Sequence, residues 1–482
     1  MPEYKRVSSA GAHILAFPFP AQGHMLPVLD LIHQLALLQS HLTITILVTP
    51  KNVPILTPLL ATHPHIQTLV LPFPTHLSIP AGVENMKDLP PHAVTAMICA
   101  MGQLYNPLLE WFRSQRSPPT VILSDFFLGW TYKLACQLNI RRIVFSSSGA
   151  ILLSVISELW RNMPEVPDDL NETISFSNIP HSPSYPWWHL SSIYRNYKKG
   201  DPDSEFIRNG LMANFDSWGV VCNTFSELES AYLGHVKKVV GHDRVWAVGP
   251  LMAHTIHKPI EKDGSSLRNK ILSWLDTCSD NSVVYVSFGS QTVLTNKQTE
   301  ELALGLEQSG AKFIWSVKAP TSVHVASEYG MIPDGFEERV AGKGIVIKGW
   351  VEQVLILRHR AIGAFLTHCG WNSVLESLVA GVPMLTWPFG ADQFMDAKLL
   401  IEETGVAIKV CEGEKTIPNR SELAQALAIS VSENGFAKER TRAGELSKAA
   451  LSAVKEGGVS SLDLDDLVRN NLCYRPQKRK NR

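Results

Sequence analysis

The sequence of 482 residues lacks the features that mark several large classes of protein. Its formal charge is −1 at pH 7, with 44 basic and 45 acidic residues, so no basic excess indicates nucleic acid as a partner. No run of 18 or more apolar residues is present, and no membrane insertion is expected. The apolar run after Lys5 and Arg6 is short and contains prolines, so a signal peptide is not expected either.

Cysteine is scarce and scattered. The seven cysteines form no C-x-x-C pair, and their odd number argues against a disulfide framework or a zinc site. This usage is typical of a reducing compartment. We therefore expect a cytoplasmic protein, and a monomer.

Two common nucleotide-binding motifs are also missing. No G-x-G-x-x-G follows the first apolar run, which argues against an NAD-dependent dehydrogenase. The Gly342-Lys343 pair lacks the spaced upstream glycine of a P-loop. Two D-x-D sequences, at residues 201–203 and 463–465, follow no buried strand, so we interpret them as surface acids.

Short apolar runs alternate with longer amphipathic segments through both halves of the chain. Runs too short and too uniformly apolar to be surface strands, separated by segments of helical length, indicate parallel sheets covered on both faces. The expected strands are residues 13–19, 42–49, 66–73, 120–127, 141–147 and 219–225 in the first half, and 283–289, 312–317, 344–350, 362–367, 382–387 and 405–410 in the second.

The predicted fold class is therefore α/β, with two doubly wound domains that each open on a strand and a turn. We place the first domain at residues 1–250, a linker at 251–266, the second domain at 267–465 and a terminal segment at 466–482. Two insertions interrupt the first domain, at residues 74–91 and about 163–216. Their aromatic residues, such as Trp187 and Trp188, are typical either of a pocket wall or of a satellite core under a loop.

Special-purpose residues are most concentrated between Trp350 and Gln393. An apolar strand at 362–367 runs into a turn at 368–371 and a helical pattern at 372–380. The N-terminus of such a helix binds phosphate readily, and His368, Asn372 and Ser373 can donate hydrogen bonds there. Ser373 and Glu376 also match a capping box, S-x-x-E, and that pattern alone favours capping.

The surroundings of this helix favour a ligand site. Trp350 and Gln353 precede it, we expect Trp371 to be exposed in the turn, and Asp392 and Gln393 follow the next strand. These 44 residues resemble the signature box of plant secondary-product glycosyltransferases, the family 1 enzymes that use UDP-sugars. The resemblance implies the GT-B fold, in which two Rossmann-like domains face each other across a cleft, and a last helix that crosses back to the first domain.

The resemblance also implies a role for each residue of the box. Trp350 stacks on uracil and the Val351 backbone pairs with the uracil edge, although Val351-Glu352 stands where the family usually has Ala-Pro. The remaining implied donor contacts are Gln353 and Glu376 to the ribose, His368, Asn372, Ser373 and Ser290 to the phosphates, and the Trp371 backbone, Asp392, Gln393 and Ser147 to the sugar.

A candidate general base lies near the end of the first expected strand. His24 follows the turn at residues 20–23, where open α/β sheets bind ligands, and an imidazole is a usable base near neutral pH. Asp125 ends another expected strand and would orient that imidazole. Each residue alone could instead cap a following helix, but the family's base and partner carboxylate fall at these two positions.

Together these patterns predict an inverting O-glycosyltransferase that moves glucose from UDP-glucose to a small phenolic or flavonoid acceptor. No metal or cofactor is expected, since UDP-glucose is a co-substrate. The likeness is greatest to subfamilies acting on flavonols and hydroxybenzoates, some of which use UDP-rhamnose, so a rhamnosyltransferase is the second hypothesis. A third, of another class, is an epimerase or a silent UDP-sugar-binding protein of the same fold.

Overall fold

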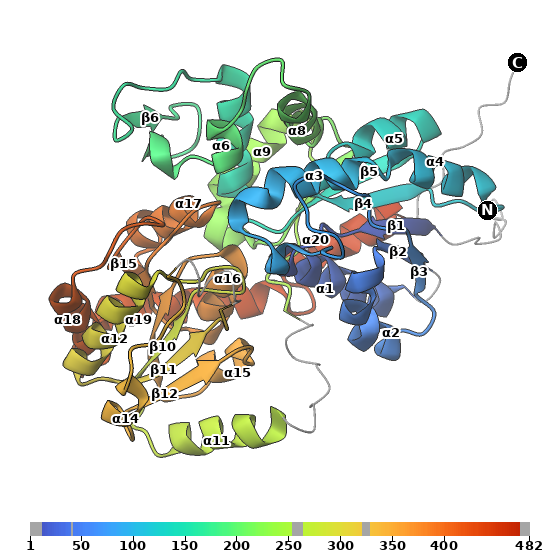
Figure 1. Cartoon of the computed structure of the whole chain (residues 1–482). Helices are drawn as coiled ribbons and strands as arrows, with labels where there is room; N and C mark the ends of the chain where they lie inside the picture. Colours follow the sequence, from blue (N-terminus) through green and yellow to red (C-terminus); the bar gives the residue numbers. More distant parts are fainter. Residues whose placement is uncertain (1–11, 40–41, 253–263, 321–327, 473–482) are drawn as a thin grey trace, which may run out of the picture.

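The computed structural model describes residues 12–39, 42–252, 264–320 and 328–472. These residues form two α/β domains that face each other, each built on one parallel sheet flanked by helices (Figure 1). The predicted class, with two doubly wound domains, is confirmed. The linker prediction falls largely on residues 253–263, which lie outside the described residues.

The first sheet has seven parallel strands in the order β3-β2-β1-β4-β5-β8-β9. Apart from the edge strand β3, their side chains are almost all buried, which explains why the sequence shows continuous apolar runs rather than alternation. The order reverses direction between β1 and β4, the switch point at which doubly wound sheets bind ligands. The strands are β1 (His13–Phe17), β2 (Thr43–Val48), β3 (Gln67–Val70), β4 (Val121–Asp125), β5 (Arg141–Ser146), β8 (Gly219–Cys222) and β9 (Val245–Ala247).

The second sheet has six parallel strands in the order β12-β11-β10-β13-β14-β15, with its switch point between β10 and β13. Every expected strand is present, although several end two residues earlier than their apolar runs. The strands are β10 (Val283–Ser287), β11 (Lys312–Val317), β12 (Gly344–Lys348), β13 (Ile362–Thr367), β14 (Met384–Thr386) and β15 (Ala407–Lys409).

Helices fill the segments between the strands, as the amphipathic patterns predict. In the first domain they are α1 (Gln22–Leu38), α2 (Thr57–Thr62), α3 (Val94–Gly102), α4 (Tyr105–Ser114), α5 (Thr131–Leu138), α6 (Ala150–Asn162), α7 (Ser192–Arg195), α8 (Pro202–Ala213) and α9 (Ser226–Val240). In the second they are α11 (Gly264–Asp276), α12 (Asn296–Ser309), α14 (Phe336–Arg339), α15 (Gln353–Leu357), α16 (Trp371–Ala380), α17 (Gln393–Lys398), α18 (Arg420–Ser430) and α19 (Ala437–Ala453).

The insertion at 163–216 contains the satellite core that was one alternative for it, and it also contacts the second domain. It carries the hairpin of β6 (Thr173–Ser175) and β7 (Ser184–Pro186), and its Tyr185 and Trp187 are buried in the core of the first domain. Trp188 and His189 instead contact Phe394 of the second domain, with ring centroids 5.1 and 4.1 Å away. The aromatic loop is thus partly a satellite core and partly a bridge between the domains.

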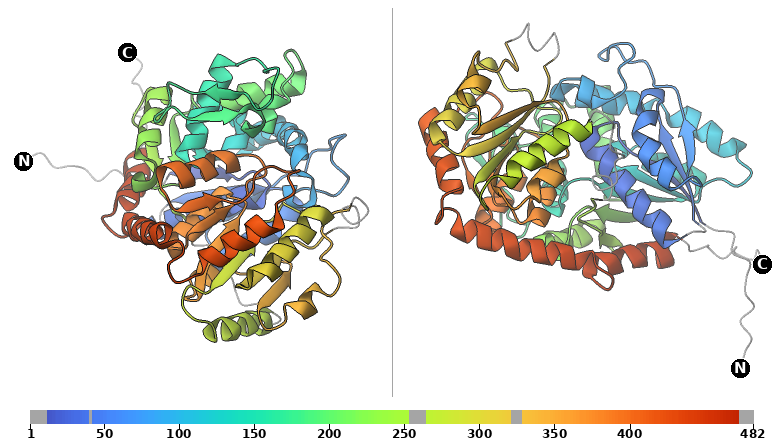
Figure 2. Two further views of the ribbon diagram at one scale, coloured as in Figure 1. Left: turned by 90° about the vertical axis from the view of Figure 1, so that its left-hand side faces the viewer. Right: turned by 90° about the horizontal axis from the view of Figure 1, so that it is seen from below.

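The end of the chain returns to the first domain, and Figure 2 shows α19 and α20 (Val459–Asp466) running beneath both domains. Asp463 Oδ2 accepts a hydrogen bond from Ala247 N at 2.8 Å, and Asp466 Oδ2 accepts one from Trp246 Nε1 at 2.7 Å. The helix α20 that makes these contacts begins at Val459, within the range assigned to the second domain, and the predicted domain bounds stay a prediction. Asp463 is also not a surface acid, because it fastens this helix to β9.

The two domains share apolar packing as well as chain crossings. One cluster of buried side chains joins Ala150 and Ile151 of the first domain to Trp371 and Val374 of the second. Within the described residues, no helix combines the length and hydropathy that crossing a bilayer would need.

Candidate active site

His24 and Asp125 meet at the carboxyl edge of the first sheet. His24 lies in the first turn of α1, and Asp125 ends β4 with a fully buried side chain. The distance from His24 Nδ1 to Asp125 Oδ2 is 3.0 Å. The helix-capping alternative fails for His24, because the N-cap of α1 is Ala21. Asp125 does cap the next turn, since its Oδ1 accepts from Phe127 N at 2.9 Å while Oδ2 faces the imidazole.

The surroundings of His24 fix its ring and its basicity. Ser147 Oγ lies 3.0 Å from Nδ1, and the ring stacks on Phe127 with centroids 4.9 Å apart. Burial lowers the pKa of His24, but the negative charges of Asp125 and Asp392 outweigh it, so the pKa lies above its usual value. Because Nδ1 is engaged by Asp125 and Ser147, Nε2 is the nitrogen placed to accept a proton.

Across the cleft, α16 begins at Trp371 directly after the turn that follows β13. Its N-cap is Gly370, and no side chain caps it, so the capping-box interpretation of Ser373 and Glu376 is wrong. Ser373 is the third residue of the helix rather than its cap. The first backbone N–H groups of α16 therefore remain available to an anion.

Gln353 ties the start of α15 to α16. Its Nε2 donates to Ser373 Oγ at 3.0 Å and to Glu376 Oε2 at 2.7 Å, while its Oε1 accepts from the Tyr285 hydroxyl at 3.1 Å. Burial raises the pKa of Glu376 to about 7, and the bond from Gln353 partly opposes this. Hydrogen bonds donated by neighbouring hydroxyl groups stabilise the ionised form of a buried carboxyl group.

Two glycines, Gly289 and Gly370, leave room for the imidazole ring of His368. A Cβ atom at Gly289 would lie 2.7 Å from His368 Nε2, and one at Gly370 would lie 2.5 Å from it. Gly289 also has a φ of +76°, a conformation that favours glycine. Burial lowers the pKa of His368 to about 4, so the imidazole is neutral at pH 7 and acts through hydrogen bonds rather than charge. Ser290 follows Gly289 at this same edge of the second sheet.

Trp350 and Val351 follow β12 at the rim of the cleft. The Trp350 side chain is 56% exposed, whereas Val351 packs partly against the core. The unusual Glu352 pairs with Arg268 of α11, with Oε2 and Nε 3.5 Å apart. The extra charge at this turn is thus balanced within the second domain.

The expectation that Trp371 is exposed is wrong. Its side chain is only 3% exposed, and its Nε1 donates to the carbonyl oxygen of Asn223 in the first domain at 2.7 Å. The ring also lies against Gly149, where a Cβ atom would come within 2.7 Å of it. An indole at the start of α16 is buried because the facing domain covers it, which no local pattern reveals.

Two further predicted residues, Asp392 and Asn372, lie where the domains touch. Asp392 Oδ2 accepts from Ser148 Oγ at 2.5 Å, and Asn372 Nδ2 donates to the carbonyl oxygen of Gly23 at 3.0 Å. Burial raises the pKa of Asp392, while Ser148 and His24 lower it in part. Gln393 uses its Oε1 within its own loop, where it accepts from Phe389 N at 2.8 Å.

Sequence reasoning missed several residues of this site. Phe127 stacks on the base, Ser148 contacts Asp392, Gly289 makes room for His368, and Tyr285 supports Gln353. The runs at residues 125–127, 146–148 and 285–290 each contain one residue that was recognised. The missed residues could therefore have been found by examining the neighbours of the recognised ones.

The described residues contain no group of three or more His, Cys, Asp or Glu placed to hold a metal ion. What the site does assemble is a histidine bonded to a carboxylate on one wall and a helix N-terminus with a neutral histidine on the other. This arrangement can deprotonate a hydroxyl group next to a bound anionic leaving group.

Comparison with known proteins gives a consistent result. The family described as UDP-glucoronosyl and UDP-glucosyl transferase matches residues 255–447. UDP-glycosyltransferase 89B2 of Stevia rebaudiana is 57% identical over 468 residues, which is 96% of this chain and 98% of the relative.

Two Arabidopsis thaliana proteins are also similar. Flavonol 3-O-glucosyltransferase UGT89B1 is 52% identical, covering 95% of this chain and 96% of that one. The crystal structure of UGT89C1 complexed with UDP-L-rhamnose superposes with a TM-score of 0.79 at 37% identity, covering 97% of this chain and all of that one (100%).

Proposed function

Since the chain belongs to the plant family 1 UDP-glycosyltransferases, enzymes of the GT-B fold, we propose that it transfers glucose from UDP-glucose to a hydroxyl group of a flavonol-like phenol. The transfer proceeds with inversion at the anomeric carbon and without a metal ion. The roles of the individual residues given below are part of this proposal.

One observation carries the mechanism. Asn372, in the first turn of α16, donates to the carbonyl oxygen of Gly23, and Gly23 is the residue before His24. The helix N-terminus that suits a diphosphate is therefore one hydrogen bond away from the backbone that holds the base. A sugar that leads from the diphosphate into the cleft would meet His24 directly.

The reaction is a single displacement. His24 Nε2 takes the proton of the acceptor hydroxyl, and the acceptor oxygen forms a bond to the anomeric carbon. The bond from that carbon to the diphosphate oxygen breaks on the opposite face, giving the glycoside and UDP. Asp125 stabilises the imidazolium that forms, because its carboxylate contacts Nδ1 at 3.0 Å.

The second domain binds the donor and receives the developing charge. The N–H groups of α16, with His368, Asn372, Ser373 and the nearby Ser290, face the diphosphate. The remaining contacts in this proposal are Trp350 and the Val351 backbone to uracil, Gln353 and Glu376 to the ribose, and Asp392, Gln393, the Trp371 backbone and Ser147 to the sugar.

Glucose is the first choice of sugar. Asp392 and Gln393 end the box as in the family's glucose users, and the Arabidopsis relative at 52% identity is named a flavonol 3-O-glucosyltransferase. Rhamnose is the second candidate, because UGT89C1 was crystallised with UDP-L-rhamnose at 37% identity.

The test is a product assay with purified protein. UDP-glucose, UDP-rhamnose and UDP-galactose are each incubated with flavonols and simple phenols in EDTA, and the products are weighed by mass spectrometry. A hexose adduct from UDP-glucose is expected, and a deoxyhexose adduct from UDP-rhamnose alone would move the assignment to the second candidate. UDP binding without any adduct would contradict transfer and favour a binding protein or an epimerase.

We also propose that the enzyme is a cytoplasmic monomer. The six cysteines among the described residues are all free, as is usual in a reducing compartment. Size-exclusion chromatography with light scattering and fractionation of plant cells would test the two statements separately.

A further inference from the structure

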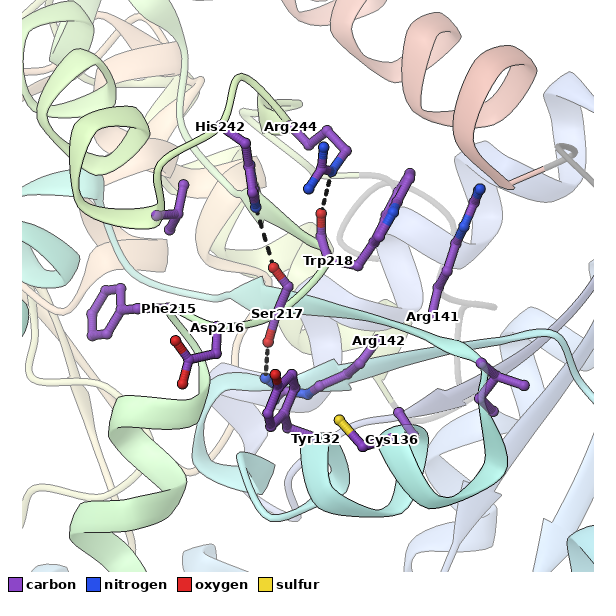
Figure 3. Close-up of a pocket in the computed structure, with 13 residues that line it drawn as sticks. Tyr132, Cys136, Arg141, Arg142, Phe215, Asp216, Ser217, Trp218, His242 and Arg244 are labelled. Atoms are coloured by element: carbon purple, nitrogen blue, oxygen red, sulfur yellow. Dashed lines mark hydrogen bonds between the residues drawn. The ribbon is translucent and has the colours of Figure 1, made fainter. Parts of the chain in front are cut away.

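A buried arginine lies behind the catalytic pair. Arg142 of β5 is 1% exposed, yet it points along the sheet toward the end of β4, where Asp125 stands. Figure 3 shows Arg142 at the floor of a pocket of about 440 Å³ on the side of the first domain. Burying a guanidinium ion costs several kcal/mol unless other charges and dipoles compensate it.

The hydrogen bonds of Arg142 reach three separate elements. Nε donates to Ser124 Oγ at 3.0 Å and to Thr131 Oγ1 at 2.9 Å, and Nη1 donates to Asn214 Oδ1 at 2.9 Å and Ser217 Oγ at 2.6 Å. These partners are neutral oxygen atoms that position the guanidinium without cancelling its charge.

The hydrogen-bond network of Arg142 also contacts the turn that carries the Asp125 carboxylate. Arg142 Nη2 lies 3.5 Å from the carbonyl oxygen of Asp125, and Asn214 Nδ2 donates to the carbonyl oxygen of Phe126 at 2.9 Å. The consecutive backbone carbonyl groups of Asp125 and Phe126 thus contact Arg142 and its hydrogen-bond partner Asn214.

The charge of Arg142 also acts on Asp125. Burial lowers the pKa of Arg142 to about 9, and the negative charge of Asp125 raises it in opposition, so the arginine is a cation at neutral pH. A cation favours the ionised form of a nearby carboxylate.

We propose that Arg142 is a positioning residue for transfer: it holds the turn of Asp125 and supplies the positive charge that keeps the His24–Asp125 pair deprotonated and ready to act as base. This inference rests on the proposed function of the pair. Removing a cation beside the pair strengthens its affinity for a proton, whichever of the two residues carries that proton. The neutral base would then be lost at a higher pH.

Other titratable groups surround the pair and the arginine. Asp392 faces His24 from the second domain. Those that line the pocket near Arg142 are Tyr132 and Cys136 of α5, Asp216 and His242 in loops, and Arg141 and Arg244, which stack on Trp218.

The test compares pH profiles of kcat/KM for the acceptor. Arg142→Gln removes the charge and should move the midpoint of the acid limb up by about one pH unit, the usual size for one nearby charge. Below that midpoint kcat/KM then falls about tenfold relative to wild type. Arg142→Lys keeps the charge and should keep the wild-type midpoint, even if turnover falls because fewer donors hold the turn.

Two further variants make the test specific. Ser217→Asp places a carboxylate against Nη1 without removing the arginine, so it should raise the midpoint as well and serves if Arg142→Gln does not fold. Arg141→Gln is the matched control, because Arg141 is the preceding residue and its guanidinium stacks on Trp218 at 4.2 Å. It should leave the profile unchanged.

The outcomes separate this inference from the proposed function. If wild type shows no transfer, or if His24→Ala retains it, the proposed function fails. Another outcome is that wild type has an acid limb, and that Arg142→Gln and Ser217→Asp leave its midpoint in place but lower turnover equally at every pH. In that case the role of Arg142 is only structural. An equal shift in Arg141→Gln would also overturn the inference, because it would reflect general surface charge.

Discussion

The two walls of the cleft are built in opposite ways. On the first wall, the residues of the proposed site come from distant parts of the chain, since His24 is 101 positions from Asp125 and 123 from Ser147. On the second wall, nearly all proposed donor contacts lie within the 44 residues from Trp350 to Gln393. The first wall depends on the sheet to bring its parts together, whereas the second depends on one strand, turn and helix.

This difference should separate chemistry from donor binding. A change on the first wall should reduce turnover and leave the affinity for UDP intact, and a change on the second should do the reverse. The predictions below test that separation in order of expected effect.

The largest effect is expected for His24→Ala. Loss of the base should reduce kcat by roughly two to four powers of ten, the usual contribution of general base catalysis. Calorimetric titration should find the dissociation constant of UDP nearly unchanged. Normal turnover in this variant would mean that the proton leaves by another route, and the first wall would no longer be the site of the chemistry.

Asp125→Asn should reduce kcat by about one to two powers of ten, because the imidazolium loses its stabilising charge. The pKa of His24 lies above its usual value partly through this carboxylate, so its removal should lower that pKa. The acid limb of kcat/KM should therefore move to lower pH, opposite to the shift expected for Arg142→Gln. A limb that stays in place would show that Asp125 does not act on the titrating base.

Trp350→Ala tests the second wall. Stacking of a base on an aromatic ring contributes about 1–3 kcal/mol, so UDP should bind roughly tenfold or more weakly. Turnover at saturating donor should remain close to wild type. The control is Leu462→Ala, since this side chain is 56% exposed on α20, far from the box in sequence, and should not alter UDP affinity. Unchanged UDP binding in Trp350→Ala would remove the stacking role.

The smallest effect is expected for Glu352→Gln. The ion pair with Arg268 is partly exposed, and such pairs contribute about 0–1 kcal/mol. The dissociation constant of UDP should change by less than about fivefold, and added salt should reduce the difference. A larger change would show that the departure from the family's Ala-Pro turn alters the donor site directly.

The fold could be predicted because burial leaves a strong trace in the sequence. Strands covered on both faces must be continuously apolar, and each of those runs is a strand in the structure. Element ends were less predictable: β4 stops at Asp125 although the apolar run continues to Phe127. The side chain of Asp125 caps the next turn and ends the strand there.

The site could be predicted where local geometry decides it and not where the facing domain does. The spacing from β13 to α16 is set by one tight turn, so the helix that we propose binds the diphosphate could be predicted from residues 362–380. The burial of Trp371 depends on Asn223, 148 positions earlier in the chain, and the failure of the capping box depends on where the helix starts. The hydrogen-bond partners of Arg142 could likewise not be predicted from the sequence, because three elements converge on it only in the folded domain.

The return of α20 to the first domain has a consequence for how the protein is made. Leu464, Leu467 and Val468 belong to the same apolar cluster as Ile14, Ile44 and Trp246, so residues that follow the second domain in the chain complete the core begun by the first strand. A ribosome releases these residues only after the second domain has been translated. The nascent first domain must therefore wait, with part of its core uncovered, while the entire second domain is produced.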